Sequence, residues 1–82
     1  MPRRESKDPD AETFGAIIRR LREERGWTQD QLAERAGMNG SYVGYLERGE
    51  NVPTLSIILL LAETLKIEAA EIVREVAEIR RS

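Results

Sequence analysis

The sequence predicts an all-α protein, a compact domain of five helices. Hydrophobic residues recur at helical spacing along most of the chain, and no segment alternates between apolar and polar residues as a β-strand does. Glycines follow several of the periodic segments at the positions where helices end. A chain of 82 residues suits a single domain of this kind.

The composition argues against several classes of function. The sequence contains neither cysteine nor histidine, which removes disulfides, thiolate or imidazole metal sites and the usual nucleophile–base pairs. We therefore expect no enzyme, no metal and no cofactor. The longest apolar run, residues 57–62, is far shorter than the roughly 18 residues of a membrane span. With no signal-like segment visible, we expect a cytoplasmic protein without a membrane partner.

The chain is interpreted as a flexible arm, residues 1–9, followed by one domain, residues 10–82. The arm carries two prolines and mixed charge without periodicity. Asp10 is the expected cap of a first helix, and Gly26 is its expected stop. Apolar residues at helical spacing mark the buried side of this helix: Phe14, Ile17, Ile18 and Leu21.

The second and third helices are short and lie close together in sequence. Thr28 and Gln31 form a capping-box pattern, which predicts a helix over residues 29–36 that stops at Gly37. A new helix is expected to begin at Asn39 or Gly40 within three residues of that stop, and Gly49 is expected to end it. The buried side of this pair is expected to contain Leu32, Ala33, Ala36, Val43 and Leu46.

Two further helices follow. Thr54 is the expected cap of a helix over residues 55–65, and a fifth helix is expected over residues 69–80. The fourth helix is apolar on most of its surface. We expect six of its residues to fill the core: Leu55, Ile58, Leu59, Leu61, Ala62 and Leu65. The remaining apolar residues of the two helices are expected to form an exposed patch for dimerisation: Ile57, Leu60, Ile72, Val76 and Ile79.

Two short helices joined by a three-residue, glycine-containing turn are typical of a helix-turn-helix. The stretches Trp-Thr-Gln-Asp-Gln-Leu-Ala-Glu-Arg-Ala-Gly, Tyr-Val-Gly-Tyr-Leu-Glu-Arg-Gly-Glu and Pro-Thr-Leu resemble the Cro/C1-type (XRE) family of repressors. The resemblance covers roughly residues 13–68 and implies a lambda-repressor-like fold. Within the family, the run from Tyr42 to Glu50 is similar to controller proteins of restriction–modification systems.

This resemblance implies a role for individual residues. Gln29 would bind a DNA phosphate at the start of the second helix. Five positions of the recognition helix would face the major groove: Asn39, Gly40, Ser41, Gly44 and Tyr45. Three residues would lie near the flanking DNA backbone: Tyr42, Arg48 and Asn51. Glu47 would pair with an arginine of the first helix, which we expect to be Arg22.

The recognition helix departs from the family pattern at Gly40 and Gly44, which offer no side chain to read a base. Direct readout would then rest on Asn39, Ser41 and Tyr45. The shape of the DNA, or arginines of the arm such as Arg3 and Arg4, would have to supply more of the specificity than usual.

The sequence therefore predicts a transcriptional regulator that binds a pseudo-palindromic operator in double-stranded DNA as a homodimer, with no small-molecule ligand. Two alternatives remain open. An antitoxin or anti-factor with the same fold would use the apolar patch for a protein partner. A helical interaction module without DNA binding would account for the net charge of −2 and for the two recognition-helix glycines.

Overall fold

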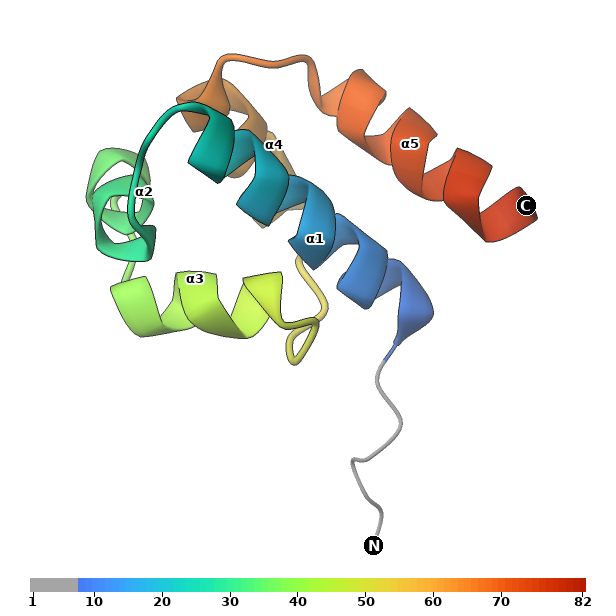
Figure 1. The fold of residues 1–82 in the computed structure, drawn as a ribbon, viewed down its shortest axis with the longest axis horizontal. Coiled ribbons are helices and arrows are strands. Elements are labelled where there is room, and N and C mark those ends of the chain that lie inside the picture. Colours follow the sequence, from blue (N-terminus) through green and yellow to red (C-terminus); the bar gives the residue numbers. More distant parts are fainter. Residues whose placement is uncertain (1–7) are drawn as a thin grey trace, which may run out of the picture.

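The computed structural model describes residues 8–82, which form five helices and no strand (Figure 1). The all-α expectation is therefore confirmed. The five helices are α1 (Pro9–Glu24), α2 (Gln29–Ala36), α3 (Gly40–Glu47), α4 (Leu55–Leu65) and α5 (Ala69–Arg81). α1 crosses the middle of the molecule, with α3 on one side and α5 on the other, and α4 lies behind it in this view. Arg3 and Arg4 lie outside the described residues.

Side-chain caps set most of the helix boundaries. The capping box of α2 is present, because Thr28 accepts from the backbone N–H of Gln31 and the Gln31 side chain accepts from that of Thr28. The predicted caps Asn39 and Thr54 also accept backbone N–H groups of their helices. Gly37 ends α2 in the left-handed conformation, at a φ of 71°.

The predicted cap of the first helix is wrong by two residues. Asp8, and not Asp10, is the N-cap, and its carboxylate accepts from the backbone N–H groups of Asp10 and Ala11. Pro9 takes the first helical position, where its missing N–H costs no hydrogen bond and its fixed φ suits the helix. The helix thus begins inside the segment that the sequence assigned to the arm.

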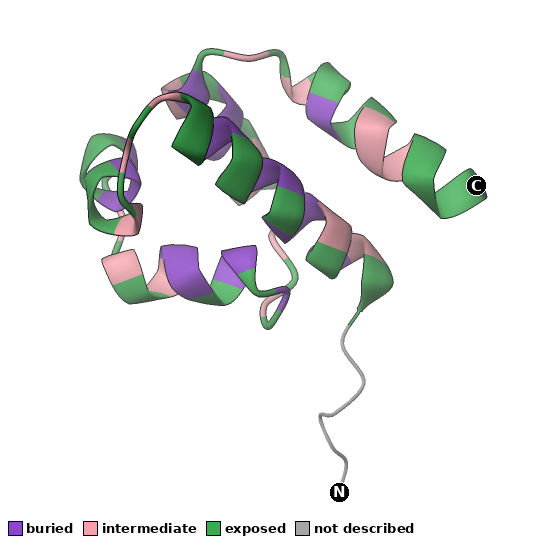
Figure 2. Ribbon diagram, viewed as in Figure 1, coloured by how far each residue is buried: buried purple, intermediate pink, exposed green. Residues whose placement is uncertain are grey.

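The core contains residues from all five helices, and Figure 2 shows the buried residues concentrated where the helices face one another. Its largest fully buried side chains are Ile18, Leu32, Val43, Leu46, Leu61, Leu65 and Ile72. The five residues expected inside the α2–α3 pair are all buried. No helix of the described chain has the length and apolar character needed to cross a membrane.

The predicted orientation of α4 is wrong in part. Leu55 and Leu59 were expected in the core, but they are 69% and 51% exposed. Ile57 and Leu60 were expected to face outward, but they are half-buried against the core. Because α4 is apolar on nearly every side, its periodicity does not distinguish the buried face from the exposed one.

The predicted patch on α5 is also wrong in part, because Ile72 is fully buried in the core and Val76 is half-buried. Ile79 is exposed, as expected, and so is Val73. Ile72 is buried because α5 packs against both α1 and α4, and its first turns contribute to the monomer's own core. A residue that is already buried in this way is not available to a second subunit.

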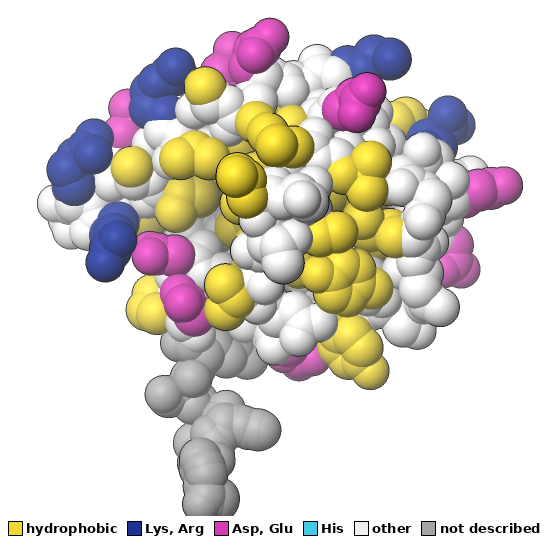
Figure 3. Space-filling view, turned by 180° about the vertical axis from the view of Figure 1, so that it is seen from behind, with side chains coloured by type: hydrophobic (Ala, Val, Ile, Leu, Met, Phe, Trp, Pro, Cys, Tyr) yellow, Lys and Arg dark blue, Asp and Glu magenta, His cyan; other side chains and the backbone are white. Residues whose placement is uncertain are grey.

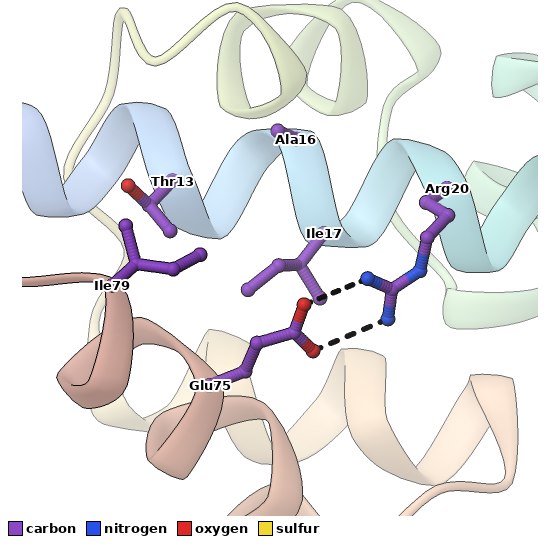
Figure 4. Close-up of a pocket in the computed structure, with 6 residues that line it drawn as sticks. All are labelled: Thr13, Ala16, Ile17, Arg20, Glu75 and Ile79. Carbon is purple, nitrogen blue, oxygen red and sulfur yellow. Dashed lines mark hydrogen bonds and ion pairs between the residues drawn. The ribbon is translucent and has the colours of Figure 1, made fainter. Parts of the chain in front are cut away.

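Polar contacts fix α5 and α4 to α1. Arg20 and Glu75 form a bidentate ion pair between α1 and α5, with N–O distances of 2.7 and 3.2 Å (Figure 4). The hydrogen bond from Arg20 lowers the pKa of Glu75. At the end of α1, the Arg25 Nε donates to the backbone carbonyl of Leu65, 2.9 Å away, which closes the last turn of α4. The helical frame that carries α2 and α3 is therefore held by both apolar and polar contacts.

Candidate nucleic-acid interface

The α2–α3 pair forms a closely packed unit against α1 (Figure 1). A Cβ atom on Gly15 of α1 would overlap the backbone carbonyl oxygens of Leu46 and Glu47 in α3. The backbones of the two helices therefore approach as closely as they do only because position 15 has no side chain. This close approach fixes the position of α3 relative to the rest of the domain.

A buried ion pair joins the same two helices. The Arg22 guanidinium donates to both carboxylate oxygens of Glu47, at 2.6 and 2.9 Å, and the two side chains are only 10% and 2% exposed. The structure thus brings together the two residues that the resemblance paired. A third bond, from Arg22 Nη1 to the carbonyl of Trp27 at 2.8 Å, reaches the segment that leads into α2. The hydrogen bond with Glu47 raises the pKa of Arg22, so this arginine carries its charge throughout the accessible pH range.

Glu47 also holds Gln29, the first residue of α2. The Gln29 amide donates to Glu47 Oε1 at a distance of 2.9 Å, so the same carboxylate oxygen accepts from Arg22 and from Gln29. An amide nitrogen has two N–H donors, and this bond uses one of them. The first turn of α2, where a phosphate would meet the free backbone N–H groups, is therefore tied to α1 and α3 through one carboxylate.

α3 presents three residues in one exposed row, at the spacing of successive turns: Ser41, Tyr45 and Arg48. Asn39 is exposed at the beginning of this row. Its side-chain oxygen accepts from the N–H of Ser41 as the cap of α3, so its amide group is partly engaged in the fold. Ser41 and Tyr45 therefore offer the side chains of the row that the fold engages least in hydrogen bonds.

Gly40 and Gly44, also predicted to face the groove, do not belong to this exposed row, because Gly40 is half-buried and Gly44 is buried. A Cβ on Gly40 would overlap the carboxylate of Asp30 in α2. A Cβ on Gly44 would lie 3.3 Å from Gln29 Oε1 and 3.1 Å from Arg48 Nη1. Both glycines therefore lie under the first turn of α2, and their lack of side chains lets that turn and the Arg48 side chain come close to α3.

The three residues predicted to lie near the DNA backbone differ in how exposed they are. Tyr42 is half-buried and packs against the core, so only part of it is accessible. Asn51 is half-buried in the connection after α3. Arg48 is exposed, but its guanidinium forms an ion pair with Glu50 and lies 5.3 Å from the centre of the Tyr45 ring.

Sequence reasoning missed two contacts of this region. One is the pair between Arg48 and Glu50, whose signal was two opposite charges on either side of a helix-ending glycine. The other is the stacking of the Arg35 guanidinium on the Trp27 ring, 4.4 Å from its centre. A helical wheel of α2 and α3 does not reveal either contact, since one partner of each lies in a connecting segment.

The described residues hold no other arrangement that suggests chemistry. No group of three or more histidine, cysteine, aspartate or glutamate side chains within residues 8–82 is placed to hold a metal ion. A depression of about 350 Å³ between α1 and α5 is lined by Thr13, Ala16, Ile17, Arg20, Glu75 and Ile79. Its charged groups, Arg20 and Glu75, already bind each other (Figure 4).

Comparisons with known proteins point to the same part of the chain. The helix-turn-helix family model matches residues 18–72. The uncharacterized HTH-type transcriptional regulator YazB of Bacillus subtilis is 38% identical over 63 residues, which cover 77% of this chain and 91% of YazB. Some other curated relatives are much longer, and the match covers only 11% and 44% of two of them.

Solved structures agree in fold. The restriction-modification controller protein C.AhdI of Aeromonas hydrophila is similar with a TM-score of 0.76 and 42% identity, over 79% of this chain and 98% of that one. The biofilm regulator SinR, solved in complex with DNA, is similar with a TM-score of 0.69 and 26% identity, over 73% of this chain and 97% of SinR. The α2–α3 pair lies within residues 18–72, the part of the chain that the family model matches.

Proposed function

The chain belongs to the helix-turn-helix family of transcriptional regulators, of the Cro/C1 type, and from this premise we propose that it binds a pseudo-palindromic operator as a homodimer in the cytoplasm. Members of this family are DNA-binding proteins and not enzymes. Beyond membership of this family, the proposal specifies that binding is sequence-specific, that the operator is two-fold symmetric and that the protein is a dimer.

The observation that carries the proposal is the fixed position of α3. Glu47 binds Arg22 of α1 and Gln29 of α2, so the exposed row of Ser41, Tyr45 and Arg48 is held in one orientation. A major groove accepts a helix that presents such a row. In this orientation, Ser41 and Tyr45 would meet base edges, while Gln29 and the N–H groups of the α2 first turn would bind phosphate.

The homodimer is supported by apolar side chains that the monomer leaves exposed. We define the apolar surface as Leu55 and Leu59 on α4 and Val73 and Ile79 on α5, all about half exposed or more. Figure 3 shows hydrophobic side chains gathered on the side of the molecule where α4 lies. A small protein seldom leaves such a surface in water. A two-fold dimer would place its two α3 helices one DNA turn apart, about 34 Å, and would therefore require a two-fold operator.

The experiment that tests the proposal is selection from a pool of random duplex DNA, followed by sequencing of the retained molecules. We expect enrichment of an inverted repeat whose half-sites are one helical turn apart. Ser41→Ala with Tyr45→Ala should reduce that enrichment without unfolding the protein, because both side chains are exposed. Retention without any enriched sequence, by protein shown to be folded, would contradict the sequence-specific proposal.

The same apolar surface favours a second candidate, an antitoxin or anti-factor that binds a protein partner through α4 and α5. The mass of the purified protein in solution separates the two. A stable dimer supports the regulator, since the surface is then covered by a second copy. A monomer that self-associates without defined stoichiometry supports a different partner for the surface.

A further inference from the structure

Arg48 lies beside the proposed phosphate-binding end of α2. It caps the C-terminus of α3, and its Nη1 atom is 3.1 Å from the position that a Cβ on Gly44 would take. The Oε1 atom of Gln29 is 3.3 Å from the same position. The side chains of Arg48 and Gln29 therefore both lie beside Gly44 of α3. An arginine at this place is suited to bind the DNA backbone next to Gln29.

In the free protein this arginine is bound by a carboxylate. Arg48 Nε donates to Glu50 Oε2 at 3.1 Å, and Arg48 Nη2 lies 3.3 Å from Glu50 Oε1. The bidentate arrangement uses the same edge of the guanidinium that binds two oxygens of a phosphate. This hydrogen bond is also the main cause that raises the pKa of Arg48. Gly49, between the two residues, has a φ of 75°, so the chain reverses there at the end of α3.

We propose that Glu50 is an intramolecular competitor for DNA phosphate, and that it limits the sequence-independent part of the affinity for DNA. The inference rests on the proposed function and adds a residue to it. DNA backbone oxygens replace the Glu50 carboxylate on Arg48 when the complex forms. The exchange requires no unfolding, since the two side chains are 52% and 40% exposed. The released carboxylate then lies close to the DNA, so the contact neutralises less phosphate charge than an unpaired arginine would.

This competition has a measurable consequence for affinity and for its salt dependence. Glu50→Gln keeps the size of the side chain and its ability to hydrogen-bond, but it removes the charge. Binding to a mixed-sequence duplex should tighten by roughly threefold to tenfold at about 50 mM salt. The slope of log Kobs against log salt concentration should become steeper by about 0.9 for each Arg48 contact, because one more DNA counterion is released.

The test is a double-mutant cycle measured by fluorescence anisotropy on a labelled mixed-sequence duplex, between about 50 and about 200 mM salt. Glu50→Gln is introduced into the wild-type chain and into an Arg48→Gln chain. Glu24→Gln is the matched control, because it makes the same change of net charge in an exposed ion pair with Arg20 on α1, at 3.7 Å. Circular dichroism of every variant verifies that the fold is retained.

The competition predicts that Glu50→Gln tightens binding only where Arg48 is present, and that Glu24→Gln changes neither affinity nor slope. Equal tightening in the Arg48→Gln chain would overturn the inference, since Glu50 would then repel DNA by its charge alone. An unchanged affinity and slope, in a protein that binds the duplex, would also overturn it and leave the proposed function standing. If the folded wild-type protein binds no duplex of any sequence, the proposed function fails and the inference fails with it.

Discussion

Glu47 of α3 is the charged residue of the candidate interface that links α3 to both α1 and α2. It binds Arg22 through both carboxylate oxygens and accepts from Gln29 through one of them. Burial of a carboxylate is costly unless its oxygens are satisfied, and here the guanidinium and the amide satisfy both. The same residue therefore stabilises the domain and sets the orientation of Gln29.

Glu47→Gln should destabilise the domain by about 3 kcal/mol, because it removes the buried carboxylate that binds the buried Arg22 charge at short distance. For a domain of this size, the thermal midpoint should fall by roughly 10 to 20 °C, which calorimetry or circular dichroism measures. Glu24→Gln, in an exposed ion pair with Arg20, is the control and should change stability by no more than about 0.5 kcal/mol. A similar loss of stability in both variants would show that the buried Arg22–Glu47 pair stabilises the domain no more than an exposed ion pair does.

The sequence predicted which side chains of the candidate site lie close together better than it predicted which side of α3 each residue occupies. The pairing of Arg22 with Glu47 came from the resemblance, since residues 25 positions apart leave no local signal. The resemblance placed Gly40 and Gly44 among the groove-facing positions, and it carried no information about the side of α3 that the first turn of α2 covers. Glu50 was missed because its partner lies across a left-handed glycine, outside any helical periodicity.

At the scale of the helices, the position of α3 depends on close backbone packing. Gly15 faces the carbonyl oxygens of Leu46 and Glu47, which are backbone atoms and can move only if α3 moves. Gly44 faces the ends of Gln29 and Arg48, which are flexible side chains. Both glycines are helical, but a side chain at Gly15 would overlap backbone atoms, whereas one at Gly44 would meet side-chain ends that can shift.

Gly15→Ala should therefore destabilise the protein by about 2 kcal/mol or more, although alanine is the better helix former by about 1 kcal/mol. Gly44→Ala is the matched control and should leave stability unchanged or raise it by up to about 1 kcal/mol. Urea unfolding of the two variants measures both values. If Gly15→Ala proved as stable as the wild type, the close approach of α1 and α3 would not be a requirement of the fold.

Helix boundaries were predictable because caps are local. The capping box at Thr28, the cap at Thr54 and the glycine after α2 each specify a terminus within a few residues. The buried face of α4 was not predictable, since Leu55, Ile57, Leu59 and Leu60 are all apolar and each of them suits a core. Packing against α1, α2 and α5 decides the orientation of α4, and that packing involves residues far apart in the sequence.

For the whole molecule, the net charge of −2 is a constraint on how it would bind DNA. Several arginines are already engaged within the described structure: Arg20 with Glu75, Arg22 with Glu47, and Arg48 with Glu50. Each of these three arginines therefore brings a carboxylate with it, which reduces its attraction for the DNA backbone. Two copies on one duplex would double the available contacts, and the affinity of such a protein should therefore depend strongly on dimerisation.

The apolar surface provides the test of that dependence. Leu59→Glu places a charge on an exposed residue of α4, so the monomer should keep its fold. In a two-fold interface, the substitution places one carboxylate from each subunit in an apolar contact, and the dimer dissociation constant should rise roughly a hundredfold or more. Sedimentation equilibrium measures the constant, and anisotropy on the selected operator should show weaker binding in parallel.

Arg19→Gln is the control for Leu59→Glu, because it shifts the net charge by the same amount at an exposed position of α1. It should leave the dimer constant unchanged. A wild-type protein that stays monomeric at high concentration would contradict the dimer directly. A Leu59→Glu variant that dimerises normally would show instead that the subunits meet elsewhere. If that variant dissociates and still binds the operator with full affinity, the two half-sites are read independently, and the dimer is not what determines occupancy of the operator.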